Sequence, residues 1–494
     1  MSLLEETKAM EERTIAELPW LAPIGVLVLT AMLAVILALF VARGRQGRVG
    51  AFVAGGHLLA AGLTVWVWLD LGPSEVMEGT VMMDGLGLAM VAVLGVAGAV
   101  GVAMARPVVA DTDREGEFYA LLTAATLASA VLVVAADIAL IAMALGMLSL
   151  TSFVLTGYLR RSARGNEASL KYYIYGSASG AAMVYGFSWW FGLTGETSLA
   201  GIGERLPEAP TAALVGSTAL VVLGLGYKAA LVPFHFWTPD VYDGAPLPVA
   251  AYLSVLPKIA GLVALARVLP TALPDDAAGW SVAMAAIAAA TMTLGNLAAL
   301  RQRNVVRLLA YSSIAQSGYL LMGVAALPGS DQGLPALVYY VIAYAVTNLA
   351  AFAVVLVVQR ERHSVDVSAF AGLGARHPWW TAALILSLLS LVGIPPLGGF
   401  VGKLEVFTAA IDAGQSWLAV VAVINTVISL FYYLRVIAPT VLQAEEGALP
   451  GRQPDLRSRP LTAALAVTTL ATVAVGVGAE PLLRLAESAT MLGG

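Results

Sequence analysis

A lysine and a proline interrupt a long apolar segment, which reads Gly224-Leu-Gly-Tyr-Lys228-Ala-Ala-Leu-Val-Pro233-Phe-His-Phe-Trp-Thr-Pro-Asp240-Val-Tyr-Asp-Gly-Ala-Pro246. In a bilayer, a charged side chain at the centre of a helix costs about 3 kcal/mol. The backbone groups that proline leaves free also need partners from protein or water. Because the two features occur together, this segment is a candidate functional site.

Composition points to a membrane protein. Apolar residues make up 59% of the 494 residues, charged residues 12%, and the mean hydropathy is +0.84. A soluble protein carries about 25% charged residues. Runs of roughly 20 apolar residues recur from Trp20 almost to the C-terminus, and each is long enough to span a bilayer. We therefore expect an all-α polytopic membrane protein, with residues 1–494 forming a single integral domain.

We expect about fourteen transmembrane helices. They fall into N-terminal helices at 20–106, a first repeat at 117–268, a second repeat at 281–436 and a last helix at 462–483. Spans four to eight and nine to thirteen show the same order of features, and in each set the fourth span is broken by proline near a lysine. These spans are 211–237, with Lys228 and Pro233, and the segment with Pro395, Pro396 and Lys403. Repeats of five spans enter the membrane in opposite directions, which predicts two inverted repeats.

The distribution of charge predicts the orientation. Arginines follow the first span, at Arg43, Arg45 and Arg48, whereas the loop after the sixth span carries Glu196 and Glu204. By the positive-inside rule, both termini should lie on the outer side.

Several kinds of site are excluded by composition. The chain has no cysteine, which rules out iron–sulfur clusters and thiolate zinc sites, and its four histidines show no metal-ligand spacing. The net charge of −5, with no basic tract, argues against a nucleic-acid partner. We expect no metal and no cofactor in this chain.

Lysine usage suggests proton transfer. The chain has five lysines and 22 arginines, yet we expect the cations in apolar surroundings to be only Lys228, Lys258 and Lys403. Arginine stays charged, whereas a desolvated lysine can lose its proton near neutral pH. The three lysines are therefore predicted to exchange protons. The alternative is that they are structural ion-pair partners.

Other polar residues are candidates for supporting roles. Glu405 follows Lys403 by two residues, a spacing that does not share a helical face. In Tyr311-Ser-Ser-Ile-Ala-Gln316-Ser-Gly-Tyr319, Ser312 and Gln316 share one face. With Asn296, Asn348 and Asn425 they would hold a water chain, or else form ordinary interhelical hydrogen bonds worth about 1 kcal/mol.

His235 and Asp240 lie just past the first break. We expect them either to gate proton uptake or to cap and anchor the loop.

Several motifs together resemble the subunit N (subunit 2) type of antiporter-like proteins from respiratory complex I. They are Met83-Asp-Gly-Leu, Gly116-Glu-Phe-Tyr-Ala-Leu-Leu, Ser169-Leu-Lys-Tyr-Tyr, the segment 228–246, Asn296-Leu-Ala-Ala-Leu-Arg-Gln, Arg307-Leu-Leu-Ala-Tyr-Ser-Ser and Gly393-Ile-Pro-Pro-Leu-Gly-Gly-Phe-Val-Gly-Lys403. The resemblance implies a proton-translocating membrane-arm subunit of a bacterial NADH:quinone oxidoreductase, located in the cytoplasmic (inner) membrane. It also implies that Lys228, Lys258 and Lys403 relay protons.

The same resemblance implies the partners of the chain. Other membrane-arm subunits and the lipid bilayer would surround it, and NADH, FMN, iron–sulfur clusters and quinone would bind to partner subunits. This chain would have no redox centre of its own.

One position departs from the family. Members usually carry a glutamate in the fifth span, where this chain reads Met143-Ala-Leu-Gly146-Met-Leu-Ser-Leu150. A carboxylate there would stabilise the charged form of Lys228. Pumping through the first half of the chain is therefore expected to be altered or lost. Two alternatives are an Mrp-type cation/proton antiporter subunit and a structural membrane-arm subunit that has lost its pump.

Overall fold

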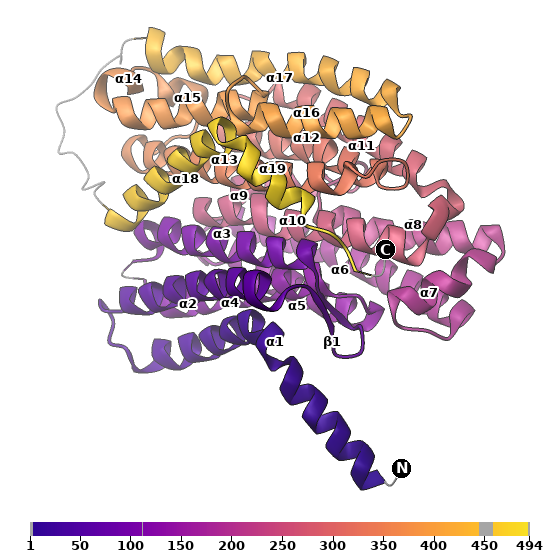
Figure 1. The fold of residues 1–494 in the computed structure, drawn as a ribbon. Helices are drawn as coiled ribbons and strands as arrows, with labels where there is room; N and C mark the ends of the chain where they lie inside the picture. Colours follow the sequence, from indigo (N-terminus) through magenta and orange to yellow (C-terminus); the bar gives the residue numbers. More distant parts are fainter. Residues whose placement is uncertain (1–2, 111, 444–457, 493–494) are drawn as a thin grey trace.

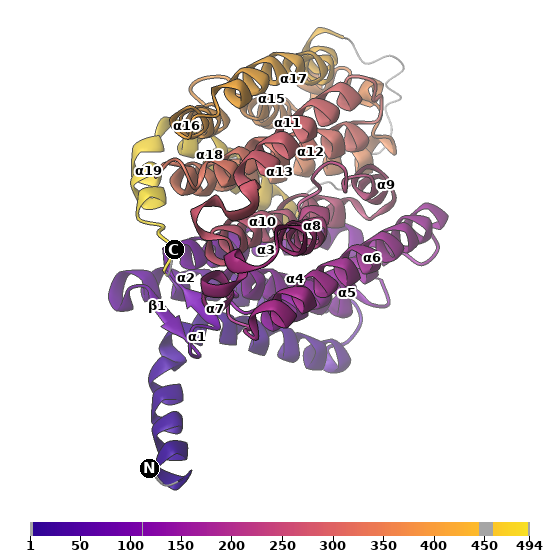
Figure 2. The same cartoon turned by 90° about the vertical axis from the view of Figure 1, so that its right-hand side faces the viewer.

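The computed structural model describes residues 3–110, 112–443 and 458–492, which form a bundle of long helices with a short β-hairpin (Figures 1 and 2). The α-helices of this part are α1 (Leu3–Phe40), α2 (Gly47–Trp66), α3 (Gly85–Val109), α4 (Glu115–Val134), α5 (Ile138–Thr156), α6 (Ala163–Thr194), α7 (Leu199–Arg205), α8 (Thr211–Lys228), α9 (Trp237–Gly244), α10 (Leu247–Ala272), α11 (Trp280–Ala299), α12 (Val305–Ala326), α13 (Gly333–Arg362), α14 (Leu373–Arg376), α15 (Pro378–Val392), α16 (Gly398–Asp412), α17 (Ser416–Leu442), α18 (Arg459–Val477) and α19 (Ala479–Glu487).

Within the described residues, twelve helices are long and apolar enough to cross a membrane. The fourteen spans expected from the sequence differ from this set at two places. The first is α6, whose 32 residues intersperse apolar side chains with glycine, serine and tyrosine. The second is the pair α15 and α16, which are 15 residues each and therefore too short to span a bilayer alone.

Both proline-broken helices are present. The segment expected as one broken span at 211–237 is helical until Lys228, where α8 ends, and α9 starts at Trp237. In the second, α15 ends at Val392 and α16 begins at Gly398. Pro233 lies in the first connection, and Pro395 and Pro396 lie in the second. Since proline has no backbone N–H and clashes with the preceding turn, a helix does not continue regularly through these positions.

The centre of the bundle is built from α10, α12 and α13. In the most apolar stretch of α10, 100% of the residues are buried. The share of buried residues is 94% in α12 and 89% in α13, but only 22% in the corresponding stretch of α1. The first turns of α1 project away from the body in both views (Figures 1 and 2). Lys258, on α10, is therefore carried by the most enclosed helix.

The hairpin was not expected from the sequence. Strands β1 (Ser74–Val76) and β2 (Val81–Met83) pair antiparallel, with Ser74 opposite Met83. Strands of three residues are too short to show a periodic pattern, so hydrophobic periodicity gives no signal for them. The hairpin and α7 lie at one end of the bundle, and α14 lies at the opposite end (Figure 1).

Arg267 corrects one expectation. We expected lysine to supply every cation in apolar surroundings, but the Arg267 side chain on α10 is only 2% exposed. It donates two hydrogen bonds, at 2.7 and 2.8 Å, to the Asp84 carboxylate, which is 0% exposed and also caps α3. The planar guanidinium matches a carboxylate in two parallel bonds, so arginine suits a buried site that holds a fixed negative partner.

This ion pair predicts a large effect on stability. Arg267→Met leaves the Asp84 carboxylate buried without its partner, and we expect a loss of about 3–5 kcal/mol of unfolding free energy. Thermal unfolding of the purified chain in detergent measures the effect. Arg484→Met is the control, because its pair with Glu480 is 74% and 70% exposed and should contribute about 0–1 kcal/mol. Equal losses for both variants would contradict a special role for the buried pair.

Candidate functional site

Lys228, Lys258 and Lys403 are all buried, with exposed fractions of 1%, 0% and 3%. They lie on α8, α10 and α16. In the described part of the chain, none of the three ammonium groups has a carboxylate within 4.0 Å. Other groups must therefore stabilise their charge.

Lys228 is the last residue of α8. Its Nζ lies 3.5 Å from the hydroxyl of Tyr172 on α6 and 5.3 Å from the centre of that ring, and the ring of Phe153 is 6.0 Å away. The end of a helix carries a partial negative charge on its free carbonyls, and aromatic faces attract cations. These two effects favour an ammonium group at this position.

Lys403 has a similar position at the second break. Its Nζ donates a 2.8 Å hydrogen bond to the carbonyl of Val392, the last residue of α15. It lies 4.2 Å from the centre of the Tyr319 ring and 3.4 Å from Thr426 Oγ1. Lys228 thus lies at the C-terminal end of the first half of its broken helix, whereas Lys403 lies on the second half and reaches the end of the first half with its ammonium group.

Lys258 lies between them. Its Nζ donates to Ser313 Oγ on α12 at 2.8 Å, and the ring centre of Tyr242 on α9 is 5.9 Å away. One turn further along α10 is Gly261, where an added Cβ would lie 3.3 Å from the carbonyl carbon of Lys228. This absent side chain lets α10 pack directly on the end of α8.

One face of α12 extends from Lys258 towards Lys403. Next to Ser313, Ser312 is hydrogen-bonded to Tyr433 at 2.5 Å. Gln316 donates to the Leu391 carbonyl at 2.9 Å and accepts from Tyr340. Gln316 and Lys403 therefore bind successive carbonyls, those of Leu391 and Val392, at the end of α15. The break in this helix brings the two side chains to one site.

The three asparagines pair with other helices and do not reach the lysines. Asn296 donates to Asn425 at 3.1 Å and accepts from Tyr432, whereas Asn348 donates to Ser254. This arrangement agrees with the simpler expectation of ordinary interhelical hydrogen bonds.

Two of the supporting candidates are apart from the lysines. Glu405 is half-buried and, among the described residues, forms no ion pair with Lys403, as the two-residue spacing implies. His235 lies in the turn between α8 and α9, where its ring is beside the carbonyl of Pro233.

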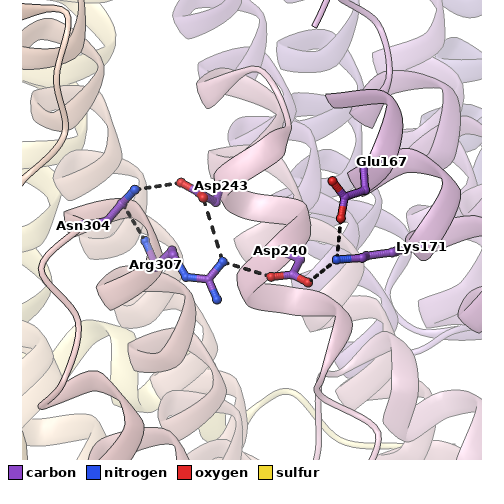
Figure 3. Close-up of polar contacts among 6 residues, drawn as sticks. All are labelled: Glu167, Lys171, Asp240, Asp243, Asn304 and Arg307. Carbon is purple, nitrogen blue, oxygen red and sulfur yellow. Dashed lines mark hydrogen bonds and ion pairs between the residues drawn. The ribbon is translucent and has the colours of Figure 1, made fainter. Parts of the chain in front are cut away.

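Asp240 belongs to a charged cluster that surrounds a pocket of about 250 Å³ (Figure 3). Its carboxylate accepts from Lys171 Nζ on α6 and from Arg307 Nη1 on α12, both at 2.9 Å. Glu167 binds Lys171 at 2.8 Å, and Asn304 donates to Asp243 at 2.7 Å. We call these six residues the α9 cluster. Of the two expected roles for Asp240, the contacts favour anchoring.

The electrostatics of Asp240 agree with that role. Burial raises the pKa of its carboxyl, but hydrogen bonds from Lys171 and Arg307 outweigh burial and hold the pKa below its usual value of 3.8. The carboxyl is therefore ionised at neutral pH, and the bridge between α6 and α12 is charged.

Gly146 lies on the outward face of α5. It lines a groove of about 220 Å³ between α5 and α6, whose lining also includes Gly176 and Phe153. An added Cβ at Gly146 would meet no atom within 4 Å. The position that resembles the family's glutamate site therefore has room for a larger side chain.

Sequence reasoning missed the aromatic and hydroxyl partners of the lysines. These partners are Tyr172, Tyr242, Tyr319, Ser313 and Thr426. Tyr172 is inside the quoted motif Ser169-Leu-Lys-Tyr-Tyr, but no spacing in the sequence shows which lysine it would meet, because the two residues come from different helices.

The close packing at the second break predicts that the stability of the protein depends strongly on Gly399. A Cβ at this position would lie 1.8 Å from the Ser390 carbonyl oxygen, so Gly399→Ala should push α16 away from α15 and cost about 1–3 kcal/mol. Gly146→Ala is the control, because its Cβ has open space and alanine favours a helix by about 1 kcal/mol. Thermal unfolding in detergent compares them. A Gly399→Ala variant as stable as Gly146→Ala would show that the close approach is not required.

Comparisons with known proteins identify relatives along most of the chain. The family described as "NADH:quinone oxidoreductase/Mrp antiporter, TM" matches residues 135–429. NADH-quinone oxidoreductase subunit N 1 of Streptomyces griseus is 39% identical over 469 residues, covering 94% of this chain and 96% of the relative. Subunit N 2 of Roseiflexus castenholzii is 38% identical and covers 94% of each chain.

Two solved structures have the same fold. A chain of respiratory complex I from Thermus thermophilus with bound aureothin has 30% identity and a TM-score of 0.79, covering 94% of this chain and 99% of that one. A chain of the Mrp complex from a Dietzia species has a TM-score of 0.84 over 96% of this chain and 97% of that one, and at 24% identity it supports the fold alone.

Proposed function

Because the chain belongs to the NADH:quinone oxidoreductase/Mrp antiporter family, and within it to the subunit N type of NADH:quinone oxidoreductase, we propose that it translocates protons in the membrane arm of that complex. Lys228, Lys258 and Lys403 relay the protons. The redox cofactors and quinone bind to partner subunits. The relatives named above are bacterial, which supports placement in a bacterial cytoplasmic membrane.

The observation that carries this proposal is the set of contacts around the three lysines. Each ammonium group is buried, has no carboxylate within 4.0 Å in the described residues and lies near a hydroxyl group, that of Tyr172, Ser313 or Thr426. A lysine held by hydroxyls and carbonyls, with no fixed counter-charge, can give up its proton more readily than a lysine in an ion pair. Hydroxyl groups both donate and accept, so they suit proton transfer.

The topology belongs to the same proposal. We infer fourteen crossings, with α6 and the pair α15–α16 joining the twelve apolar helices, and both termini on the outer side. We also infer inverted repeats, 117–268 and 281–436. The positions of the two breaks support them, because α8–α9 and α15–α16 each form the fourth span of a repeat.

The two halves of the chain should not contribute equally to proton translocation. Lys403 has hydrogen bonds at 2.8 and 3.4 Å, whereas the closest polar partner of Lys228 is a hydroxyl at 3.5 Å. With Gly146 in place of an acid, we expect the first half to hold a proton less firmly than the second. An Mrp-type antiporter subunit is the alternative supported by the shared fold.

Replacing the relay lysines tests the function. Lys258→Met and Lys403→Met should slow the relay by about 100-fold and lower the proton-to-electron ratio of the intact complex in proteoliposomes. The Arg484→Met variant should keep the parental ratio, because its pair is exposed. If the Lys228, Lys258 and Lys403 variants all pump and turn over normally, the chain is a structural subunit.

Gly146→Glu tests the first half. The open groove accepts the side chain, and its carboxylate should stabilise the charged form of Lys228, so the proton-to-electron ratio should rise. Gly146→Gln has the same shape without the charge and should leave the ratio unchanged. An equal ratio for wild type and Gly146→Glu, with a fully coupled wild type, would contradict a defect at this position.

A further inference from the structure

Helix α9 covers two of the relay lysines with aromatic side chains. The Trp237 ring stacks on Tyr172, with centroids 4.4 Å apart and planes at 15°, and the Tyr172 hydroxyl faces Lys228. On the same short helix, the Tyr242 ring lies 5.9 Å from Lys258 Nζ. Trp237 and Tyr242 are 1% and 0% exposed. The position of α9 therefore decides how closely both lysines are covered.

The α9 cluster fixes that position. Helices α6 and α9 meet in two adjacent layers, because Lys171 and Tyr172 are neighbours in sequence, and Trp237 and Asp240 are one turn apart. The outer layer is the Lys171–Asp240 pair, and the inner layer is the Tyr172–Trp237 stack. Asp240 also binds Arg307, so a single carboxylate ties α9 to both α6 and α12 (Figure 3).

One buried hydroxyl of the same segment has no protein partner among the described residues. Thr238 Oγ1 is buried and has no hydrogen bond within the described residues, whereas the Tyr242 hydroxyl lies beside Ser313 and the His235 ring lies beside the Pro233 carbonyl. Buried polar atoms almost always have a partner, either protein or ordered water. The Thr238 hydroxyl, next to Trp237, therefore has the capacity to bind a water molecule on the α9 segment.

We propose that Asp240 is a positioning residue of the proton route: its bridge to Lys171 and Arg307 holds α9 as a cover over Lys228 and Lys258. Release of the bridge loosens Trp237 and Tyr242 and opens both lysines to water from the pocket of the α9 cluster. The role of this water access in proton transfer rests on the proposed function, whereas the position of α9 over the two lysines does not.

The absence of cysteine allows a direct test of access. Lys228→Cys, Lys258→Cys and Lys403→Cys each place one thiol in the chain. A membrane-impermeant thiol reagent is added to the intact complex, and modification of this subunit is followed by mass. Asp240→Ala should make alkylation at positions 228 and 258 about tenfold faster, because access to a buried group follows the opening equilibrium of its cover. Alkylation at position 403 should stay within about twofold, since the contacts of Lys403 do not involve α9.

Two further variants separate positioning from general loosening. Glu167→Gln also removes a partner of Lys171, but Glu167 is 65% exposed and lies on α6 itself, so alkylation should not change. Asp240→Glu keeps the carboxylate and should restore slow alkylation. If Asp240→Ala does not fold, Lys171→Met removes one arm of the bridge and should speed alkylation at positions 228 and 258 in the same way.

The outcomes distinguish this inference from the proposed function. Unchanged alkylation at positions 228 and 258 in Asp240→Ala would overturn the cover, whatever the lysine variants show about pumping. Equal acceleration at all three positions would also overturn it, because the variant would then loosen the whole bundle. Acceleration confined to positions 228 and 258 supports the cover even if the proton-to-electron ratio shows no role for the lysines.

Discussion

The hydrogen bond from Lys403 to the Val392 carbonyl joins an ammonium group to the end of a helix that stops inside the bundle. A continuous helix has no free carbonyl at that depth, because every interior carbonyl is bonded to its own chain. The break thus creates the partner that a buried cation needs. Lys228 is the last residue of α8 at the other break, and its ammonium group meets the hydroxyl of Tyr172. The arrangement of α10 and α12 follows from these two ends, since α10 packs on one and Gln316 of α12 binds the other.

The choice between lysine and arginine follows the partner. Arg267 is as buried as the lysines, but it faces the Asp84 carboxylate through two short hydrogen bonds. A guanidinium in such a pair keeps its proton and holds α10 against α3. The lysines face hydroxyls, carbonyls and aromatic rings, none of which carries a full negative charge. Burial is therefore common to the structural arginine and the three lysines, and the presence or absence of a carboxylate partner distinguishes them.

The two broken helices differ in how they hold their lysines. The second is tight, with Lys403 bonded to a carbonyl and close to Thr426. The first is looser, with a glycine where the family resemblance implies an acid, and with Lys228 covered mainly by Tyr172, Phe153 and the α9 segment. The charge missing from position 146 is not replaced near Lys228 in the described residues. Control of Lys228 therefore depends on its cover, and the cover depends on the ion pairs of Asp240.

The sequence by itself determined the class of protein, the two breaks and the three lysines, because hydropathy and proline act on their own segment of chain. It also carried the family resemblance through its motifs. Only the tertiary structure decided which side chains contact one another. The Arg267–Asp84 pair joins residues 183 positions apart, and Gln316 meets Leu391 from another helix. Such contacts depend on how each helix is rotated about its axis. That rotation is set by packing among all the helices, so no local pattern encodes it.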